Sequence, residues 1–204
     1  MIIAQEIIHS MHRKKGRVGQ LVLKLDLEKA YDRLEWSFIH EVLNFFKFPL
    51  NFVKLVLECV TTSSFSILVN GGQMENFKPS KGIRQGDPLS PYIFVLCMEY
   101  LSLKILEECD NNSWKGSKAS RGGPVFSHLF FAGDLLLCAK ASISCCHTIA
   151  RVLDDFCYHS GQKVSLSKSK VYFSPNVNSN FRHHLCGILR VSSTPNWGST
   201  WDFP

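Results

Sequence analysis

Apolar and polar residues follow two different periods along the chain, and these periods indicate helices and strands. Apolar residues recur every three or four positions in five segments, each of which is predicted to be a helix. These segments are 1–12, 36–48, 49–60, 90–108 and 144–158. Pro49 begins the third helix, and Ser160 with Gly161 stops the last one. Asp87 is expected to cap the helix that begins near residue 90.

The same pattern predicts two hairpins. Residues 65–72 alternate between apolar and polar and turn on an Asn-Gly pair, the strongest short-range hairpin signal, so residues 73–79 are expected to return beside them. Residues 128–131 and 135–138 are apolar and flank a short Ala-Gly-Asp segment. This arrangement predicts a second hairpin with an acid, Asp134, at its tip.

Two further apolar runs, 21–26 and 171–173, complete the predicted strands, and the first of them ends on Asp26. The predicted order is strand, helices, hairpin, helix, hairpin, helix, strand. Helices that cover one face of a small antiparallel sheet form an α+β sandwich. We therefore expect an α+β fold, and the segment after Pro175 gives only weak signals.

The composition permits a folded domain and excludes few functions. Apolar residues make up 45% of the 204 residues, which is enough for the core of one domain. Lys and Arg number 23 against 17 Asp and Glu, a formal net charge of +6. This excess is compatible with a polyanionic partner, although many ordinary domains also have it.

The cysteines and the apolar runs indicate the compartment. The eight cysteines form no Cys-x-x-Cys pattern and no zinc-type pairing with histidine, so a reducing environment is the better interpretation. Gln5 and Glu6 interrupt the apolar start, which argues against a secretory signal. No apolar run approaches the roughly 20 residues of a membrane span. We expect an intracellular protein, nuclear or cytoplasmic, with no membrane partner.

Two acids occupy comparable places, Asp26 at the end of a strand and Asp134 in the turn of a hairpin. Adjacent strands would bring both to one spot, where carboxylates suit hard cations such as Mg²⁺. Two such ions about 3.5–4 Å apart activate a hydroxyl and stabilise the leaving group in phosphoryl transfer. The spacing alone favours two ordinary strand-end acids, so this chemistry needs support from the surrounding residues.

The segments around these acids supply that support. Four segments, in the family's order, resemble the palm motifs of reverse transcriptases, particularly those of plant LINE-type (non-LTR) retrotransposons. They are Leu25–Arg33, Gly82–Pro91, His128–Asp134 and Ser160–Lys170. The second, which contains Arg-Gln-Gly-Asp-Pro-Leu-Ser-Pro, is the most specific. The resemblance implies a polymerase palm, which is a ferredoxin-like antiparallel sheet with helices on one face.

The resemblance also implies a division of the chain. Residues 1–175 would be the palm with a remnant of the fingers, and residues 176–204 would be a degenerate start of the palm–thumb junction. At that junction the family has a Gly-x-Tyr-Leu-Gly-x-Pro segment, which Trp201 and Asp202 do not fit. Fingers and thumb would thus be largely missing.

The resemblance assigns a metal site with one departure. Asp26 would bind both Mg²⁺ ions, assisted by the Leu27 carbonyl, and Asp134 would be the second acid of the catalytic turn. The family has two adjacent aspartates there, whereas this chain has Gly133 at the first position. The loss removes one oxygen ligand and one negative charge from a site for two divalent ions.

The resemblance also assigns a nucleotide site. Tyr31 would be the steric gate beside the incoming sugar, although an aromatic core residue is the other interpretation. Gln85 and Gly86 would line the nucleotide and template pocket. Arg84 would contact phosphate, or it is an exposed loop cation. Lys168 would protonate the leaving pyrophosphate, although an ordinary surface lysine is the stronger expectation.

We therefore expect an RNA-directed DNA polymerase domain in ancestry, whose family partners are an RNA template, a DNA primer and dNTP. Because of Gly133, we expect it to be inactive or nearly so. Two alternatives remain open. The first is a non-catalytic nucleic-acid-binding remnant that uses the basic loop at residues 12–17. The second is a pseudogene fragment with no selected role, poorly folded because fingers and thumb are absent.

Overall fold

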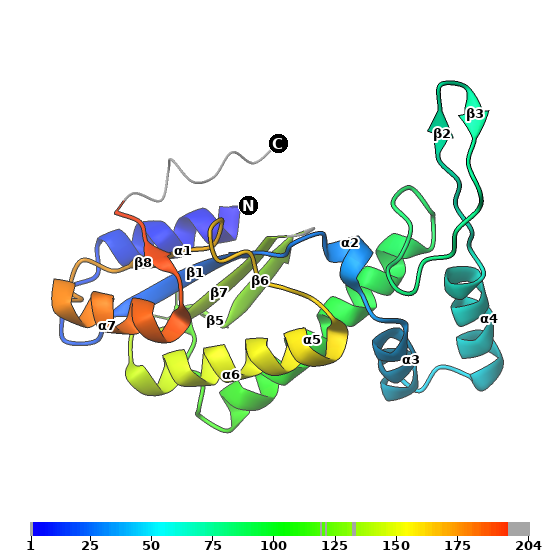
Figure 1. Ribbon diagram of the computed structural model, residues 1–204. Helices are drawn as coiled ribbons and strands as arrows, with labels where there is room; N and C mark the ends of the chain where they lie inside the picture. Colours follow the sequence, from blue (N-terminus) through cyan, green and yellow to red (C-terminus); the bar gives the residue numbers. More distant parts are fainter. Residues whose placement is uncertain (1, 119, 121, 132–133, 196–204) are drawn as a thin grey trace. The chain divides into compact units, whose positions relative to one another are not determined.

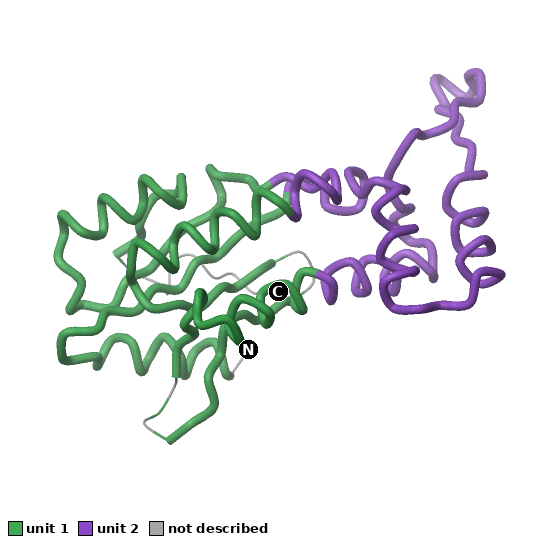
Figure 2. The backbone as a smooth tube through the Cα atoms, turned by 90° about the horizontal axis from the view of Figure 1, so that it is seen from below, with its two compact units in different colours: residues 1–27, 101–155, 164–204 green, residues 28–100, 156–163 purple. Residues whose placement is uncertain are grey.

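The computed structural model describes residues 2–118, 120, 122–131 and 134–195 (Figure 1). The chain divides into two compact units, shown in different colours in Figure 2. Unit 1 comprises Met1–Leu27, Leu101–Asp155 and Val164–Pro204, and unit 2 comprises Glu28–Tyr100 and Phe156–Lys163. Two long helices, α5 (Ser90–Asp110) and α6 (Ile143–Ser160), contribute residues to both units.

Unit 1 is built on a five-stranded sheet with the order β6-β7-β1-β8-β9. The strands are β1 (Gln20–Asp26), β6 (His128–Phe131), β7 (Asp134–Lys140), β8 (Lys170–Phe173) and β9 (Ser192–Ser193). β1 pairs in antiparallel orientation with β7 and with β8, and β9 joins β8 in parallel. A separate two-residue pair is formed by β4 (Ser117–Lys118) and β5 (Val125–Phe126).

Both faces of the sheet are covered by helices. On one face Val22, Leu136 and Tyr172 form a buried cluster with residues of α1 (Ile2–His12), among them Ile7 and Met11. Figure 1 shows the unit 1 parts of α5 and α6, together with α7 (Ser179–Leu189), on the opposite face. The predicted α+β fold is thus confirmed, whereas the prediction of helices on one face alone was wrong, because α1 covers the second face. No helix in the described ranges is both long and apolar enough to cross a membrane.

Unit 2 consists of short helices and one hairpin. The helices are α2 (Ala30–Arg33), α3 (Trp36–Phe45), α4 (Leu50–Thr61), the first part of α5 and the last part of α6, and the hairpin strands are β2 (Leu68–Val69) and β3 (Gly72–Gln73). The hairpin turns at Asn70 and Gly71, with φ angles of 49° and 83°. Positive φ at both central positions is the type I′ geometry that Asn-Gly favours, so this prediction is confirmed.

Candidate functional site

The pairing of β1 with β7 brings the two predicted acids face to face. Asp26 is the last residue of β1, Asp134 is the first residue of β7, and the two are direct partners in the antiparallel register. Because directly opposed residues project from the same face of a sheet, both carboxylates lie on one side. Both residues are half-buried. The structure therefore brings these acids together, and their catalytic role stays a prediction.

A lysine that the sequence argument did not consider lies beside this pair. Lys24 precedes Asp26 by two positions on β1 and therefore shares its face. Its ammonium nitrogen lies 3.6 Å from Asp134 Oδ2, and the Lys24 side chain is only 15% exposed. A positive charge at this distance offsets the repulsion between two neighbouring carboxylates.

Two buried serines fix the backbone of Asp26. The Asp26 N–H donates to Ser169 Oγ (3.3 Å), and the Asp26 carbonyl accepts from the Ser165 N–H (2.8 Å). The Ser169 hydroxyl in turn donates to the Ser165 carbonyl (2.7 Å). Ser169 is fully buried and Ser165 nearly so. The segment Ser160–Lys170, which resembles the fourth motif, thus fixes the backbone of Asp26 in the first motif. The sequence analysis did not predict this role.

The donor set around Asp26 and Asp134 fits a metal site only in part. Two carboxylates supply oxygen ligands of the kind that Mg²⁺ prefers. However, no group of three or more His, Cys, Asp or Glu side chains that could hold a metal occurs among the described residues. The predicted position Gly133 lies outside these residues, and the Lys24 ammonium already neutralises Asp134. The described residues therefore do not complete a two-ion site.

Leu27 directly follows Asp26 in the chain, and Lys168 belongs to the segment that binds the Asp26 backbone. Leu27 is buried and forms an antiparallel bridge with Val164. Lys168 is exposed and immediately precedes Ser169, which binds the Asp26 backbone. The two residues thus belong to the same unit as the opposed aspartates.

The loop that resembles the second motif is attached to α2 within unit 2. The Gly82 N–H donates to the Leu34 carbonyl (2.8 Å), and the Ile83 N–H donates to the Tyr31 carbonyl (2.9 Å). Gly82 has a φ of 89°, and a Cβ at this position would lie 2.8 Å from the Asp32 carbonyl oxygen. Only glycine permits both the backbone angle and the close approach.

The predicted nucleotide residues other than Lys168 all belong to unit 2. The Tyr31 ring is half-buried and stacks on Phe94, with ring centroids 5.0 Å apart and an interplanar angle of 18°. Arg84, Gln85 and Gly86 are exposed in the loop before α5. Arg84 and Gln85 line a pocket of about 540 Å³. The structure thus groups these four residues in one unit and the acids in the other.

The Asp87 side chain accepts a hydrogen bond from the backbone just before α5. Its Oδ1 accepts a hydrogen bond from the Leu89 N–H (2.8 Å), whereas α5 begins at Ser90. A capping carboxylate would instead accept from an N–H inside the first turn. The side chain therefore fixes the turn that leads into the helix, and its capping role stays a prediction.

The largely antiparallel sheet, its two opposed strand-end aspartates and the covering helices are consistent with the polymerase palm that the resemblance implied. Residues 2–194 match the family described as reverse transcriptase (RNA-dependent DNA polymerase). Since this match spans nearly the whole chain, the chain belongs to the reverse transcriptase family.

The chain also resembles proteins of known sequence. The chain is 31% identical over 143 residues to the Pol polyprotein of the type-2 retrotransposable element R2DM from Drosophila melanogaster, covering 70% of this chain and 13% of that protein. It is 42% identical over 67 residues to the uncharacterized mitochondrial protein AtMg01250 from Arabidopsis thaliana, covering 33% of this chain and 55% of that protein. The chain thus spans only part of the length of these relatives.

Solved telomerase structures share the fold. An apo telomerase from Candida tropicalis, truncated from its C-terminal domain, matches with a TM-score of 0.63 and 14% identity, over 87% of this chain and 36% of that chain. A telomerase from Candida albicans, solved in complex with a fragment of telomeric RNA, matches with a TM-score of 0.58 and 16% identity, over 87% of this chain and 30% of that chain. At this identity the likeness shows the fold alone.

Proposed function

We propose that the chain is the reverse-transcriptase palm of a non-LTR retrotransposon of the plant LINE type, descended from a two-metal nucleotidyl transferase and strongly impaired as a polymerase. The direct opposition of Asp26 and Asp134 at the ends of β1 and β7 is the observation that supports the ancestry. In this proposal residues 176–204 are the degenerate start of the palm–thumb junction. An RNA template, a DNA primer and dNTP are the partners.

The impairment follows from the ligand set. Asp26, with the Leu27 carbonyl, and Asp134 would hold Mg²⁺, and the metal would supply activation of the primer hydroxyl. Gly133 offers no ligand where the family has an aspartate. Loss of a group that merely supports a metal ligand typically costs about 10–100-fold in affinity or activity, so loss of a ligand itself is expected to cost more. Lys24 further reduces the negative charge available to a cation.

The remaining residues would serve the nucleotide. Tyr31 would limit the sugar that fits beside it, and its stacking on Phe94 would hold the ring in place. Arg84 would contact phosphate, and Gln85 and Gly86 would line the pocket for template and nucleotide. Lys168 would donate a proton to the leaving pyrophosphate, a role compatible with its exposure.

A primer-extension assay on an RNA template tests the proposal. With Mg²⁺ or Mn²⁺, we expect the chain to incorporate little or no dNTP, and Gly133→Asp to raise incorporation by at least about 100-fold. Adding Asp26→Asn to Gly133→Asp should abolish the recovered activity. Robust incorporation by the unchanged chain would overturn the impairment. An inactive Gly133→Asp variant that is normally folded would show that the missing ligand is not what limits the reaction.

A further inference from the structure

Unit 2 contains an apolar groove that the proposed reaction does not use. It lies between α4 and the start of α5, it has a volume of about 580 Å³, and all of its lining residues belong to unit 2. Leu43, Val56 and Ile93 form its buried part, and each is at most 3% exposed. Among the described residues that line it none carries a charge, and the Tyr92 hydroxyl is the one polar side-chain group. Contact of this groove with water is therefore unfavourable.

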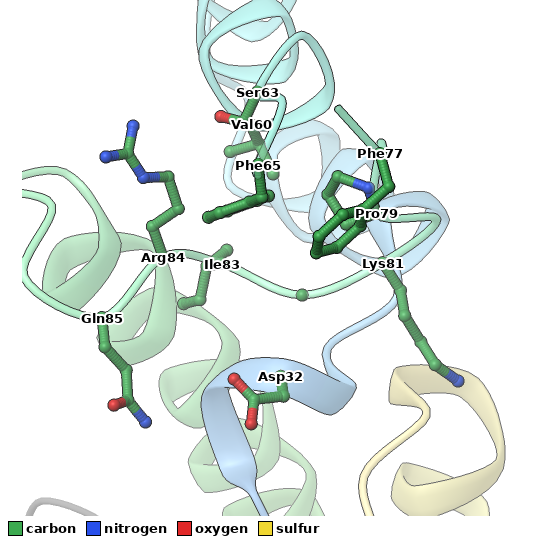
Figure 3. Close-up of a pocket in the computed structure, with 11 residues that line it drawn as sticks. Asp32, Val60, Ser63, Phe65, Phe77, Pro79, Lys81, Ile83, Arg84 and Gln85 are labelled. Atoms are coloured by element: carbon green, nitrogen blue, oxygen red, sulfur yellow. The ribbon is translucent and has the colours of Figure 1, made fainter. Parts of the chain in front are cut away.

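A second pocket of unit 2 has the opposite character. Figure 3 shows Asp32, Lys81 and Arg84 at this pocket, whose volume is about 540 Å³. Its charged groups are hydrated favourably when nothing covers them. The apolar groove has no such groups among its described lining, so covering it with another apolar surface is favourable by itself.

Large apolar side chains are exposed on both walls of the groove. On α4, Phe52 is 42% exposed and Leu55 is 58% exposed, and on α5, Tyr92 is 72% exposed and Val95 is 63% exposed. Residues three positions apart lie on the same side of a helix, so each pair forms one apolar ridge. Phe52 also stacks on Phe48, with ring centroids 5.2 Å apart and an interplanar angle of 23°. Exposed apolar surface of this extent marks an interaction site.

The size of this apolar face suits an interface between proteins. A phenylalanine or tyrosine buries about 150–250 Å² when it is fully covered. Tyr92, at 72% exposure, therefore offers more than about 100 Å² by itself. The two ridges together with the half-buried lining offer on the order of 500 Å². Two such faces bury about 1,000 Å², the total area above which a specific interface is expected.

We infer that this groove is a contact surface between two copies of the chain. A symmetric pair places the same face of each copy against the other, so the face must be complementary to itself. The groove meets this condition, because the exposed Tyr92 and Val95 stand beside a hollow that apolar side chains can fill. The net charge of +6 opposes association of two copies, but no charged side chain of the described lining is brought against its own copy. The contact needs no metal and no nucleic acid, and it does not depend on the proposed function.

Sedimentation velocity over a range of protein concentrations tests the inference on the whole chain. We expect the unchanged chain to shift from monomer to dimer as the concentration rises, and added salt to favour the dimer because it screens the net charge. Val95→Lys should weaken the dimer at least about 100-fold, since it places an unpaired charge in an apolar contact. Val95 is 63% exposed, so this substitution leaves the core of unit 2 intact.

Val69→Lys is the matched control. Val69 lies on β2 in the same unit and is 50% exposed, so this variant makes the same change of side chain and of net charge away from the groove. Its dimer dissociation constant should remain within about twofold of that of the unchanged chain, as expected for an exposed residue outside the contact. Equal weakening by the two lysines would assign the effect to net charge and would overturn the groove as the contact.

A chain that remains monomeric at every concentration would overturn the inference, and so would aggregates of no fixed size. Either result would leave the groove to another part of a longer polypeptide or to a different protein. An undiminished dimer in Val95→Lys would contradict the inference as well. If circular dichroism shows that Val95→Lys is unfolded, Tyr92→Lys decides, because the Tyr92 side chain is 72% exposed. Primer extension by Gly133→Asp tests the proposed function separately, so the failure of one leaves the other standing.

Discussion

At the scale of single residues, the position of the Asp26 carboxylate depends on groups far along the chain. The Ser169 hydroxyl, 143 positions away, accepts from the Asp26 N–H and donates to the Ser165 carbonyl. Register with β7 then sets the distance to Asp134. A hydroxyl that makes two hydrogen bonds in a fully buried place stabilises the fold and orients the acid together, because no water can replace it.

We predict that Ser169→Ala lowers the free energy of unfolding by about 1–3 kcal/mol, because it leaves the Asp26 N–H without its buried acceptor. Denaturant unfolding of the intact chain measures this change. Ser167→Ala is the control in the same segment, since Ser167 is exposed. Its effect should stay within about 0.5 kcal/mol. Equal losses in the two variants would show that the Asp26 hydrogen bond has no special weight.

The two acids could be predicted from the sequence because each lies where an apolar run begins or ends, a signal that needs only neighbouring residues. The roles of Lys24 and Ser169 could not, since their partners are brought close by strand pairing alone. Asp87 shows a different limit. Its neighbourhood was predicted, but the choice between a turn and a cap depends on a shift of one residue in the start of α5.

At the scale of elements, the periods of the sequence predicted the longer helices and both hairpins. They did not predict α7, although Asn178 caps it by accepting from the Phe181 N–H and although Leu185 and Leu189 are buried four residues apart. Such a short helix gains its stability from packing rather than from its own sequence. β9 has only two residues, too few for any alternation, and exists because it pairs with β8.

The attachment of the loop before α5 to α2 gives a prediction at this scale. Gly82→Ala should destabilise the chain by more than about 1 kcal/mol, because alanine disfavours the positive φ and its Cβ would lie 2.8 Å from the Asp32 carbonyl. Gly187→Ala is the control. It lies within α7, where nothing is within 4 Å of the added carbon, and it should be neutral or stabilising by about 0.5–1 kcal/mol. Thermal unfolding of both variants measures these effects, and a stable Gly82→Ala variant would contradict the close approach.

At the scale of the whole molecule, the residues that the family resemblance assigns are divided between two units. The opposed aspartates and Lys168 belong to unit 1, whereas Tyr31 and the loop of Arg84 to Gly86 belong to unit 2. Nucleotidyl transfer by this chain would therefore require both units to be folded. This requirement distinguishes two causes of inactivity. An impaired polymerase is folded but lacks a metal ligand, whereas a poorly folded fragment lacks a packed core.

The cysteines report on the core of each unit separately. Burial raises the pKa of the Cys97, Cys138 and Cys146 thiols to about 12, and the thiolate is the species that alkylating reagents attack. Cys97 belongs to unit 2, the other two belong to unit 1, and Cys59 is exposed. With iodoacetamide near pH 8, about half a unit below the ordinary thiol pKa, mass spectrometry should find Cys59 modified first and these three protected.

In denaturant, all eight cysteines should react, which provides the control for reagent and site. Protection of Cys138 and Cys146 with rapid labelling of Cys97 would mean that unit 2 alone is loosely packed. Labelling of all eight thiols at similar rates in buffer would instead support a poorly folded fragment. Protection in both units would exclude that alternative, because a thiol is shielded in this way only inside a packed core.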